Sequence, residues 1–240
     1  MRLSKKQSRT LIKQLVETGE LAYTYAYGRT FLEISYNRPV RVSDRVVLKP
    51  PRYPYRPRPR EVVVQIQAGT SFGAGQHPST RLALKGIDAV FSRGHTVENA
   101  PADSVLDIGT GTGVLVIAAV CLGVTRGLGI DLDACARVEA VANVTANALD
   151  DRITISGQPV ETLQQQFSLI TANLRYPSLI RLGPVLEALT AAQGVLVLSG
   201  IQEAERQDVL GAYTARGFNP TWTGKELGWT AVVLQKQAVY

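Results

Sequence analysis

Cysteine and histidine are scarce in this chain of 240 residues. The only cysteines are Cys121 and Cys135, each in an apolar, helix-forming context, and the only histidines are His77 and His95. A disulfide framework or a structural zinc site needs more of these residues in closer groups, which argues against both. The same scarcity argues against a metal-dependent catalyst, and two isolated thiols fit a reducing cytoplasm.

Long apolar runs are also missing. No run approaches the roughly 20 residues that a transmembrane helix requires. The first 15 residues are basic but lack the apolar centre of a signal peptide. With 45% hydrophobic and 19% charged residues, the chain is predicted to be a soluble globular protein with no membrane partner. It is long enough for one full α/β core and a small addition.

Acidic residues are rare at the front of the chain. Residues 1–60 contain 14 Lys and Arg against 4 Asp and Glu, whereas residues 61–240 contain 12 against 16. The net charge of +6 therefore belongs to the front segment. Such asymmetry indicates a polyanionic partner, RNA or a ribonucleoprotein surface. A solvated basic arm that only aids solubility is the alternative.

The front segment reads as a small α+β unit followed by a linker. A helix is predicted over residues 4–18, and then a hairpin of strands Leu21–Tyr27 and Thr30–Tyr36, with Val40–Leu48 as a possible third strand.

Residues 49–60 contain five prolines and four arginines, which favours an extended, semi-rigid connection. Its arginines and tyrosines could bind phosphate and stack on RNA bases, or the run could simply lie across the core. The predicted division is thus a basic segment for target recognition at 1–48, a linker at 49–60 and a catalytic domain at 61–240.

A glycine-rich turn organises the rest of the chain. Val105 to Ile108 form a short apolar run containing Asp107, and Gly109, Gly111 and Gly113 then lead into an apolar helix. Glycines suit a backbone that approaches a ligand closely, and the following helix start offers free N–H groups. A dinucleotide fingerprint would need a third glycine where Val114 stands, which disfavours an NAD-dependent oxidoreductase. The D-x-G-x-G-x-G form instead resembles motif I of class I S-adenosylmethionine (SAM) methyltransferases.

Two further strand ends carry polar side chains suited to such a ligand. Asp131 ends the next strand, 22 residues after Gly109, where a carboxylate can accept hydrogen bonds from ribose hydroxyls. Asp133 is expected to cap the helix Ala134–Ala148. Asn173 ends a later strand, and its uncharged amide could orient a donor nitrogen, although a turn-forming role is the alternative. Gln158 to Val160 are expected near the adenine edge.

The predicted fold is α/β, a class I methyltransferase (Rossmann-like) seven-stranded sheet with helices on both faces plus the small basic α+β segment. The strands of the sheet, of which the last two form a closing antiparallel pair, are expected at Val105–Ile108, Gly127–Asp131, Ile153–Ser156, Phe167–Leu174, Gly194–Leu198, Phe218–Thr223 and Thr230–Leu234. A Gly-rich segment from Ala68 to Thr80 precedes a helix at Arg81–Phe91 and has the composition of a lid over the ligand.

Three motifs in one order resemble the PrmA family, the methyltransferases of bacterial ribosomal large-subunit protein eleven. They are Phe72–Thr80, Asp107–Gly113 and Thr171–Leu174. The first matches the family pattern F-G-T-G-x-H-x-T-T except at Ala74 and Ser79. The resemblance covers roughly residues 61–235 and does not extend to the helix-hairpin front segment.

The resemblance implies SAM as cofactor, with S-adenosylhomocysteine as product and no metal. It also implies methylation of lysine side chains or the N-terminus of a ribosomal protein, with Asn173 orienting the acceptor amine. The residues expected to bind the cofactor are Phe72, His77, Thr80, Asp107, Gly109, Gly111, Gly113, Asp131 and Asn173. We nominate no general base.

Two other functions remain open at this point. The first is an RNA or small-molecule methyltransferase to which the basic segment delivers RNA. Asn173 is followed by Leu174-Arg175-Tyr176, whereas many base-amine and amide methyltransferases carry N-P-P-Y there. This difference argues against methylation of an RNA base. The second is a non-catalytic SAM- or RNA-binding module, although a scaffold would have no use for a lid.

Overall fold

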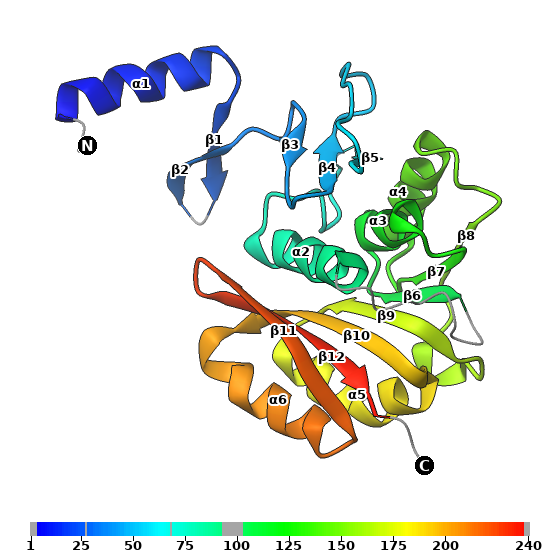
Figure 1. Cartoon of the computed structure of the whole chain (residues 1–240). Coiled ribbons are helices and arrows are strands. Elements are labelled where there is room, and N and C mark those ends of the chain that lie inside the picture. Colours follow the sequence, from blue (N-terminus) through cyan, green and yellow to red (C-terminus); the bar gives the residue numbers. More distant parts are fainter. Residues whose placement is uncertain (1–3, 27, 68, 93–102, 238–240) are drawn as a thin grey trace.

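A seven-stranded sheet forms the centre of the molecule (Figure 1). The computed structural model describes residues 4–26, 28–67, 69–92 and 103–237, so Tyr27 and His95 lie outside the described residues. The sheet consists of β6 (Ser104–Ile108), β7 (Arg126–Ile130), β8 (Ile153–Ser156), β9 (Phe167–Asn173), β10 (Thr190–Gln202), β11 (Phe218–Glu226) and β12 (Trp229–Lys236). Its order is β11-β12-β10-β9-β6-β7-β8. The five neighbouring strands β10, β9, β6, β7 and β8 are parallel, and β12 is antiparallel to both of its neighbours. The predicted seven strands and closing antiparallel pair are confirmed.

Helices cover both faces of this sheet, as predicted. On one face lie α2 (Pro78–Ser92), α3 (Val114–Leu122) and α4 (Ala134–Ala146), and on the other lie α5 (Tyr176–Leu189) and α6 (Arg206–Thr214). The short 3-10 helices η2 (Val160–Thr162) and η3 (Glu203–Glu205) complete this part. Because the central strands β6, β9 and β10 are buried on both faces, their apolar residues divide between two separate cores.

A second, three-stranded sheet packs outside α2 and α3. It consists of β3 (Val40–Arg41), β4 (Val46–Lys49) and β5 (Val62–Gln65). The single strand predicted at Val40–Leu48 is wrong, because a turn at Ser43 divides it into two antiparallel strands. The Ser43 hydroxyl accepts a hydrogen bond from the Val46 N–H at 3.1 Å, which stabilises that turn.

The proline- and arginine-rich run connects two paired strands of this small sheet. Strands β4 and β5 flank residues 50–61 and pair in parallel, with Val46 opposite Val62 and Leu48 opposite Val64. Val46 and Leu48 are buried in the same core as α2 and α3. Packing is therefore continuous across the expected linker, and the division of the chain at 49–60 stays a prediction about function only.

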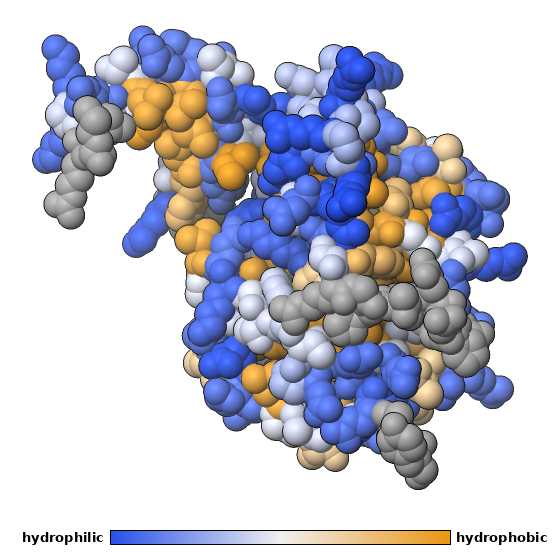
Figure 2. All heavy atoms as spheres, viewed as in Figure 1, coloured by the Kyte–Doolittle hydropathy of each residue, from blue (hydrophilic) through white to orange (hydrophobic). Residues whose placement is uncertain are grey.

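Residues 4–26 and 28–34 extend away from the core (Figure 1). Helix α1 (Lys5–Glu17) begins at a Ser4 capping box, and β1 (Leu21–Ala26) pairs antiparallel with β2 (Arg29–Ile34) around a turn at Gly28, as predicted. No residue of α1 is buried. Figure 2 shows hydrophobic side chains gathered over α1 and this hairpin. Five large apolar or aromatic side chains of this segment are exposed, at Leu11, Tyr23, Phe31, Leu32 and Ile34.

The last two strands are longer than predicted and meet in a tight turn. Leu227 and Gly228 both have positive φ, 49° and 81°, the conformation that a two-residue hairpin turn requires. Pairing therefore extends to Glu226 opposite Trp229. A non-glycine residue at positive φ has no strong local signal, which explains why the turn was not predicted.

Candidate cofactor and active site

The three glycines of the turn after β6 occupy three different environments. All have positive φ, at 68°, 54° and 82° for Gly109, Gly111 and Gly113. Gly109 is exposed, whereas a Cβ on Gly111 would lie 2.2 Å from the Phe72 carbonyl oxygen. Gly113 is the N-cap of α3. Only Gly109 therefore presents backbone surface to a ligand, while Gly111 allows another loop to approach.

Asp107 lies behind this turn rather than in the site. It is 0% exposed, and its carboxylate accepts hydrogen bonds at 2.7 Å from the hydroxyls of Thr110 and Thr171. Burial raises its pKa to about 6, although these two hydroxyls and the Val116 N–H act to lower it. The contact between Asp107 and a cofactor stays a prediction, and no part of its side chain reaches the surface in this structure. Asp107 fixes the turn and the start of α3.

Asp131 stands directly after β7, at the rim of a pocket. Its carboxylate accepts hydrogen bonds from the N–H groups of Gly111 at 2.9 Å and Asp133 at 3.0 Å. These bonds fix the carboxylate and leave each oxygen able to accept one more. Asp133 caps α4 through the Cys135 N–H, as predicted.

The pocket beside Asp131 has apolar walls and a polar rim. It has a volume of about 270 Å³ and also contacts Gly109, Gln158 and Val160, so the segment expected near an adenine edge does line it. Two contributions from α5, Ser178 and Arg181, were not predicted. Their helix follows the strand that carries Asn173, but nothing in the local sequence marks them as ligand-facing.

Asn173 ends β9 on the other side of the glycine turn. Its side-chain NH₂ group lies 3.4 Å from the Thr80 hydroxyl oxygen, which directs the amide oxygen toward Gly200. A Cβ on Gly200 would lie 3.0 Å from that oxygen and 2.4 Å from the Leu174 carbonyl oxygen. Asn173 thus keeps an amide oxygen available as an acceptor. Thr80 is buried and positions it.

The Gly-rich loop before α2 is docked over the glycine turn. The Phe72 carbonyl accepts a hydrogen bond from the Thr112 N–H at 3.1 Å, while 53% of the Phe72 side chain remains exposed. At the start of the loop, Glu139 of α4 accepts hydrogen bonds from the N–H groups of Thr70 at 2.9 Å and Ser71 at 3.2 Å. The first part of the predicted lid is therefore attached to the glycine turn and to α4.

His77 is the residue before α2, and its ring holds the loop and hairpin together. Its Nδ1 accepts a hydrogen bond from the Ser79 N–H at 3.2 Å, which replaces an ordinary N-cap. The ring lies 5.1 Å from that of Phe72 and 4.7 Å from that of Trp229, between centroids. Burial, reinforced by the charge of Arg81, lowers the pKa of His77, so the ring is neutral at pH 7.

Arg81 and Glu226 form an anchor that sequence reasoning missed. The Arg81 guanidinium binds Glu226 at 2.5 Å and donates hydrogen bonds to the carbonyl oxygens of Gly75 and Gln76 in the lid. Lys85 also contacts Glu226, at 2.8 Å. Burial acts to raise the pKa of Glu226, but these cations outweigh it and lower the pKa. The lid is thus tied to the β11–β12 hairpin, more than 140 residues further along the chain.

The fold and these contacts define an α/β protein of the class I methyltransferase architecture. Among solved structures, a ribosomal protein L11 methylase from Lactobacillus delbrueckii subsp. bulgaricus superposes with a TM-score of 0.72 at 24% identity, over 83% of this chain and 99% of that chain. A putative RNA methyltransferase from Pyrococcus horikoshii gives 0.55 at 16% identity, over 68% of this chain and 86% of that one. At these identities the likeness concerns the fold.

Sequence comparison identifies the family. The model described as ribosomal protein L11 methyltransferase (PrmA) matches residues 32–237, and the chain belongs to this family. The match begins earlier than the expected 61, inside the front hairpin. A ribosomal protein L11 methyltransferase from Geotalea daltonii is 36% identical over 83% of this chain and 64% of its own length. One from a Geobacter species (strain M21) is 32% identical over 97% of this chain and 79% of its own length.

Neither a metal-binding cluster nor a membrane-spanning helix is found among the described residues. Within the described ranges, no group of three or more His, Cys, Asp and Glu side chains could hold a metal ion. The helices of the same residues include none long and apolar enough to cross a membrane.

Proposed function

We propose that the protein binds SAM at the carboxyl ends of β6, β7 and β9. The exposed backbone of Gly109 leaves room that any side chain would fill, and the Asp131 carboxylate can accept hydrogen bonds from the ribose hydroxyls. Gln158 and Val160 would flank the adenine, with Arg181 at the rim. These groups fit a nucleoside with an amino-acid tail.

Phe72, His77 and Thr80 complete the proposed cofactor site. The docked loop would cover the methionine end of SAM, with Thr80 and Asn173 beneath it. Gly111 and Gly113 shape the turn without touching the ligand. When bound, SAM supplies an electrophilic methyl group on sulfur.

The reaction that this site supports best is methyl transfer to an amine of a protein. The observation that carries the proposal is the Asn173 amide oxygen at the strand end, where the amide is oriented by Thr80 and its oxygen lies beside Gly200. It can accept a hydrogen bond from a neutral acceptor amine and aim the nitrogen lone pair at the methyl carbon. The new C–N bond forms as the S–C bond breaks, and the amine proton passes to solvent. Alignment and exclusion of water by the loop would provide most of the acceleration.

The proposed target is a lysine of a ribosomal protein or a similar basic protein in the cytoplasm. The relatives named ribosomal protein L11 methyltransferases support this choice. We propose that residues 1–48 recognise it, because Tyr23 and Ile34 expose 63% and 52% of their surfaces on a hairpin with open edges. The basic character of residues 1–60 also favours contact with RNA near the target.

Transfer of labelled methyl groups from SAM into a ribosome-free cell extract tests the proposal. The label should appear in a protein band, should survive ribonuclease, and should be lost with the Asn173→Ala variant. Label that ribonuclease removes would instead indicate an RNA acceptor. Absence of both labelling and SAM-dependent heat release in calorimetry would refute methyltransferase activity altogether.

A further inference from the structure

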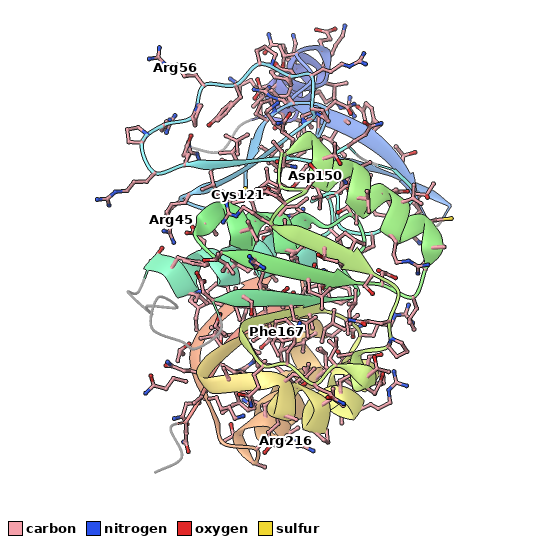
Figure 3. The ribbon with its side chains drawn as sticks, turned by 90° about the vertical axis from the view of Figure 1, so that its right-hand side faces the viewer. Arg45, Arg56, Cys121, Asp150, Phe167 and Arg216 are labelled. Atoms are coloured by element: carbon pink, nitrogen blue, oxygen red, sulfur yellow. The ribbon has the colours of Figure 1, made fainter. Side chains whose placement is uncertain are left out.

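Four arginines on the loop between β4 and β5 have no acidic partner. Arg52, Arg56, Arg58 and Arg60 are all exposed, and the described residues provide none of their side chains with an ion pair. Figure 3 shows Arg56 at the outer edge of this loop, pointing away from the body of the molecule. The loop therefore concentrates positive charge on one projecting segment.

The first half of this loop is held in shape by a lysine. The Lys49 ammonium donates to the carbonyl oxygens of Pro50 at 3.2 Å and of Pro51 and Tyr53 at 3.0 Å. It also reaches the Gln65 side-chain oxygen at 3.2 Å, on the neighbouring strand. Lys49 thus binds the carbonyl oxygens inside the loop. The arginine side chains are not needed for these bonds and lie in solvent.

The second half is held by Glu61, the only acidic residue between Lys49 and Gln65. Its carboxylate accepts hydrogen bonds from the Tyr55 hydroxyl at 2.9 Å and the Arg58 N–H at 2.7 Å, and it pairs with Arg41 of β3. The Glu61 side chain is only 1% exposed. The only acid within this stretch of sequence is therefore already paired at the base of the loop.

Proline spaces the exposed charges. Pro57 and Pro59 hold the preceding residues Arg56 and Arg58 in extended backbone conformations. In a polyproline-like segment alternate residues lie roughly 6 Å apart along the chain. An ordered loop loses little entropy on binding, and each guanidinium fork matches a phosphate oxygen pair. Arg56 and Arg58 are thus spaced along an extended stretch, while Arg52 and Arg60 lie in the turns at its two ends.

We propose that residues 50–60 bind the phosphate backbone of RNA. Tyr53, 42% exposed on the same loop, adds an aromatic face on which a base can stack. Phosphate pairing and base stacking are the two contacts that single-stranded RNA offers, so RNA is the favoured polyanion. The identity of the polyanion rests on the proposed function, in which the target is a ribosomal protein that the enzyme meets beside RNA.

Fluorescence anisotropy with a labelled single-stranded RNA of about 20 nucleotides, without SAM, tests the proposal. The variant R52Q/R56Q/R58Q/R60Q removes the four charges and no hydrogen bond made by a described side chain. Each phosphate contact adds about 0.7 to the slope of log affinity against log salt, so the slope should fall by about 3. Between about 50 and 200 mM salt, the wild type should lose about 50-fold more affinity than the variant.

A matched control removes the same charge from helix α1. The variant K5Q/K6Q/R9Q/K13Q should keep most of the wild-type slope, and an equal loss would show that net charge alone matters, which overturns the proposal. Polyglutamate that competes with RNA as well as unlabelled RNA does would also overturn it, in favour of an acidic protein. Methylation of an RNA-free protein target should be unchanged in R52Q/R56Q/R58Q/R60Q. Failure of RNA binding is therefore distinct from failure of methyl transfer.

Discussion

Single side chains around the glycine turn divide into groups that can touch a ligand and groups that only hold the site. Asp131 and Asp107 illustrate the division, because both are acids at the carboxyl ends of adjacent strands. Asp131 reaches the pocket, while Asp107 is enclosed by two hydroxyls and a helix start. The same residue type therefore faces a pocket in one position and fixes backbone geometry in the other.

Asp131→Ala should weaken SAM binding by roughly 1–3 kcal/mol, because a hydrogen bond to a charged group contributes a free energy of this size. Isothermal titration calorimetry measures the change. Asp133→Ala is the matched control, because Asp133 is an acid two residues away that caps α4 and should leave the Kd nearly unchanged. Equal Kd values for wild type and Asp131→Ala would show that the ribose is held elsewhere.

Asp107 should make stability depend on pH in mildly acid solution. Burial raises its pKa in the folded protein to about 6, above the value of an exposed Asp. The unfolded chain thus loses its proton first, and the stabilisation present below about pH 4 is lost as pH rises to about 6. The loss amounts to about 3 kcal/mol at most.

Urea unfolding of wild type and Asp107→Asn at about pH 4.5, 5.5 and 7 isolates this effect. The free energy of unfolding should fall more steeply with pH in the wild type than in the variant, whatever the variant's absolute stability. Parallel pH profiles would mean that Asp107 does not titrate in this range.

At the scale of elements, the lid is the segment whose position depends on distant partners. It is attached to α4 through Glu139, to the glycine turn through Phe72, and to the β11–β12 hairpin through Arg81 and Glu226. The half-buried Tyr36 ring, in the connection after β2, lies so close to the lid that a Cβ on Gly75 would be 2.6 Å from it. The cofactor cover is thereby joined to the segment proposed to recognise the target.

Glu226→Gln should loosen the lid without unfolding the domain. The change leaves Arg81 and Lys85 without a counter-charge, which we expect to cost about 1–2 kcal/mol of lid attachment. Hydrogen exchange at the Thr112 amide, which the Phe72 carbonyl covers, should accelerate about 5–30-fold. SAM should dissociate faster in proportion.

Glu203→Gln provides the control for the lid experiment. Glu203 also faces two cations, Lys225 and Arg206, beside the same hairpin, but it makes no bond to the lid. Its variant should exchange at the wild-type rate at Thr112. Equal acceleration in both variants would contradict a specific anchor.

The whole molecule has four packed layers and an arm. The small sheet covers α2 and α3, the large sheet lies beneath them, and α5 and α6 close the far side, while α1 and the hairpin stand apart (Figure 1). Because α1 buries no residue, the arm contributes little to the core. Its exposed apolar surface is what the proposed recognition role requires.

The double variant Tyr23→Ser/Leu32→Ser should separate target binding from chemistry. These residues face each other across β1 and β2, 63% and 37% exposed. Their loss should raise KM for the protein target about tenfold, on the scale of interface hot spots, with kcat and the Kd for SAM unchanged. Steady-state kinetics with purified target measures both constants.

Val138→Ser/Val141→Ser removes exposed apolar surface from α4 instead, at residues 70% and 49% exposed. This control should leave KM unchanged. A similar rise in both double variants would indicate nonspecific loss of solubility rather than a docking surface.

The chain by itself determined the elements with strong local signals. Apolar runs specified the seven strands, the D-x-G-x-G-x-G spacing located the glycine turn between β6 and α3, and the order of three motifs led to the family. These features depend on backbone conformation and burial over a few neighbouring residues, which local sequence controls. The observed strand ends differ from the predicted ones where a turn sets them, as at Ser43 and Leu227.

Only the tertiary structure decided which polar groups meet. Glu61 at the base of the arginine loop, Arg81 with Glu226, and the enclosure of Asp107 all join segments whose separation along the chain carries no signal. The same holds for β4 and β5, which pair across the proline-rich run. The physical reason is that hydrogen bonds and ion pairs depend on distances in space, which exist only after the layers have packed.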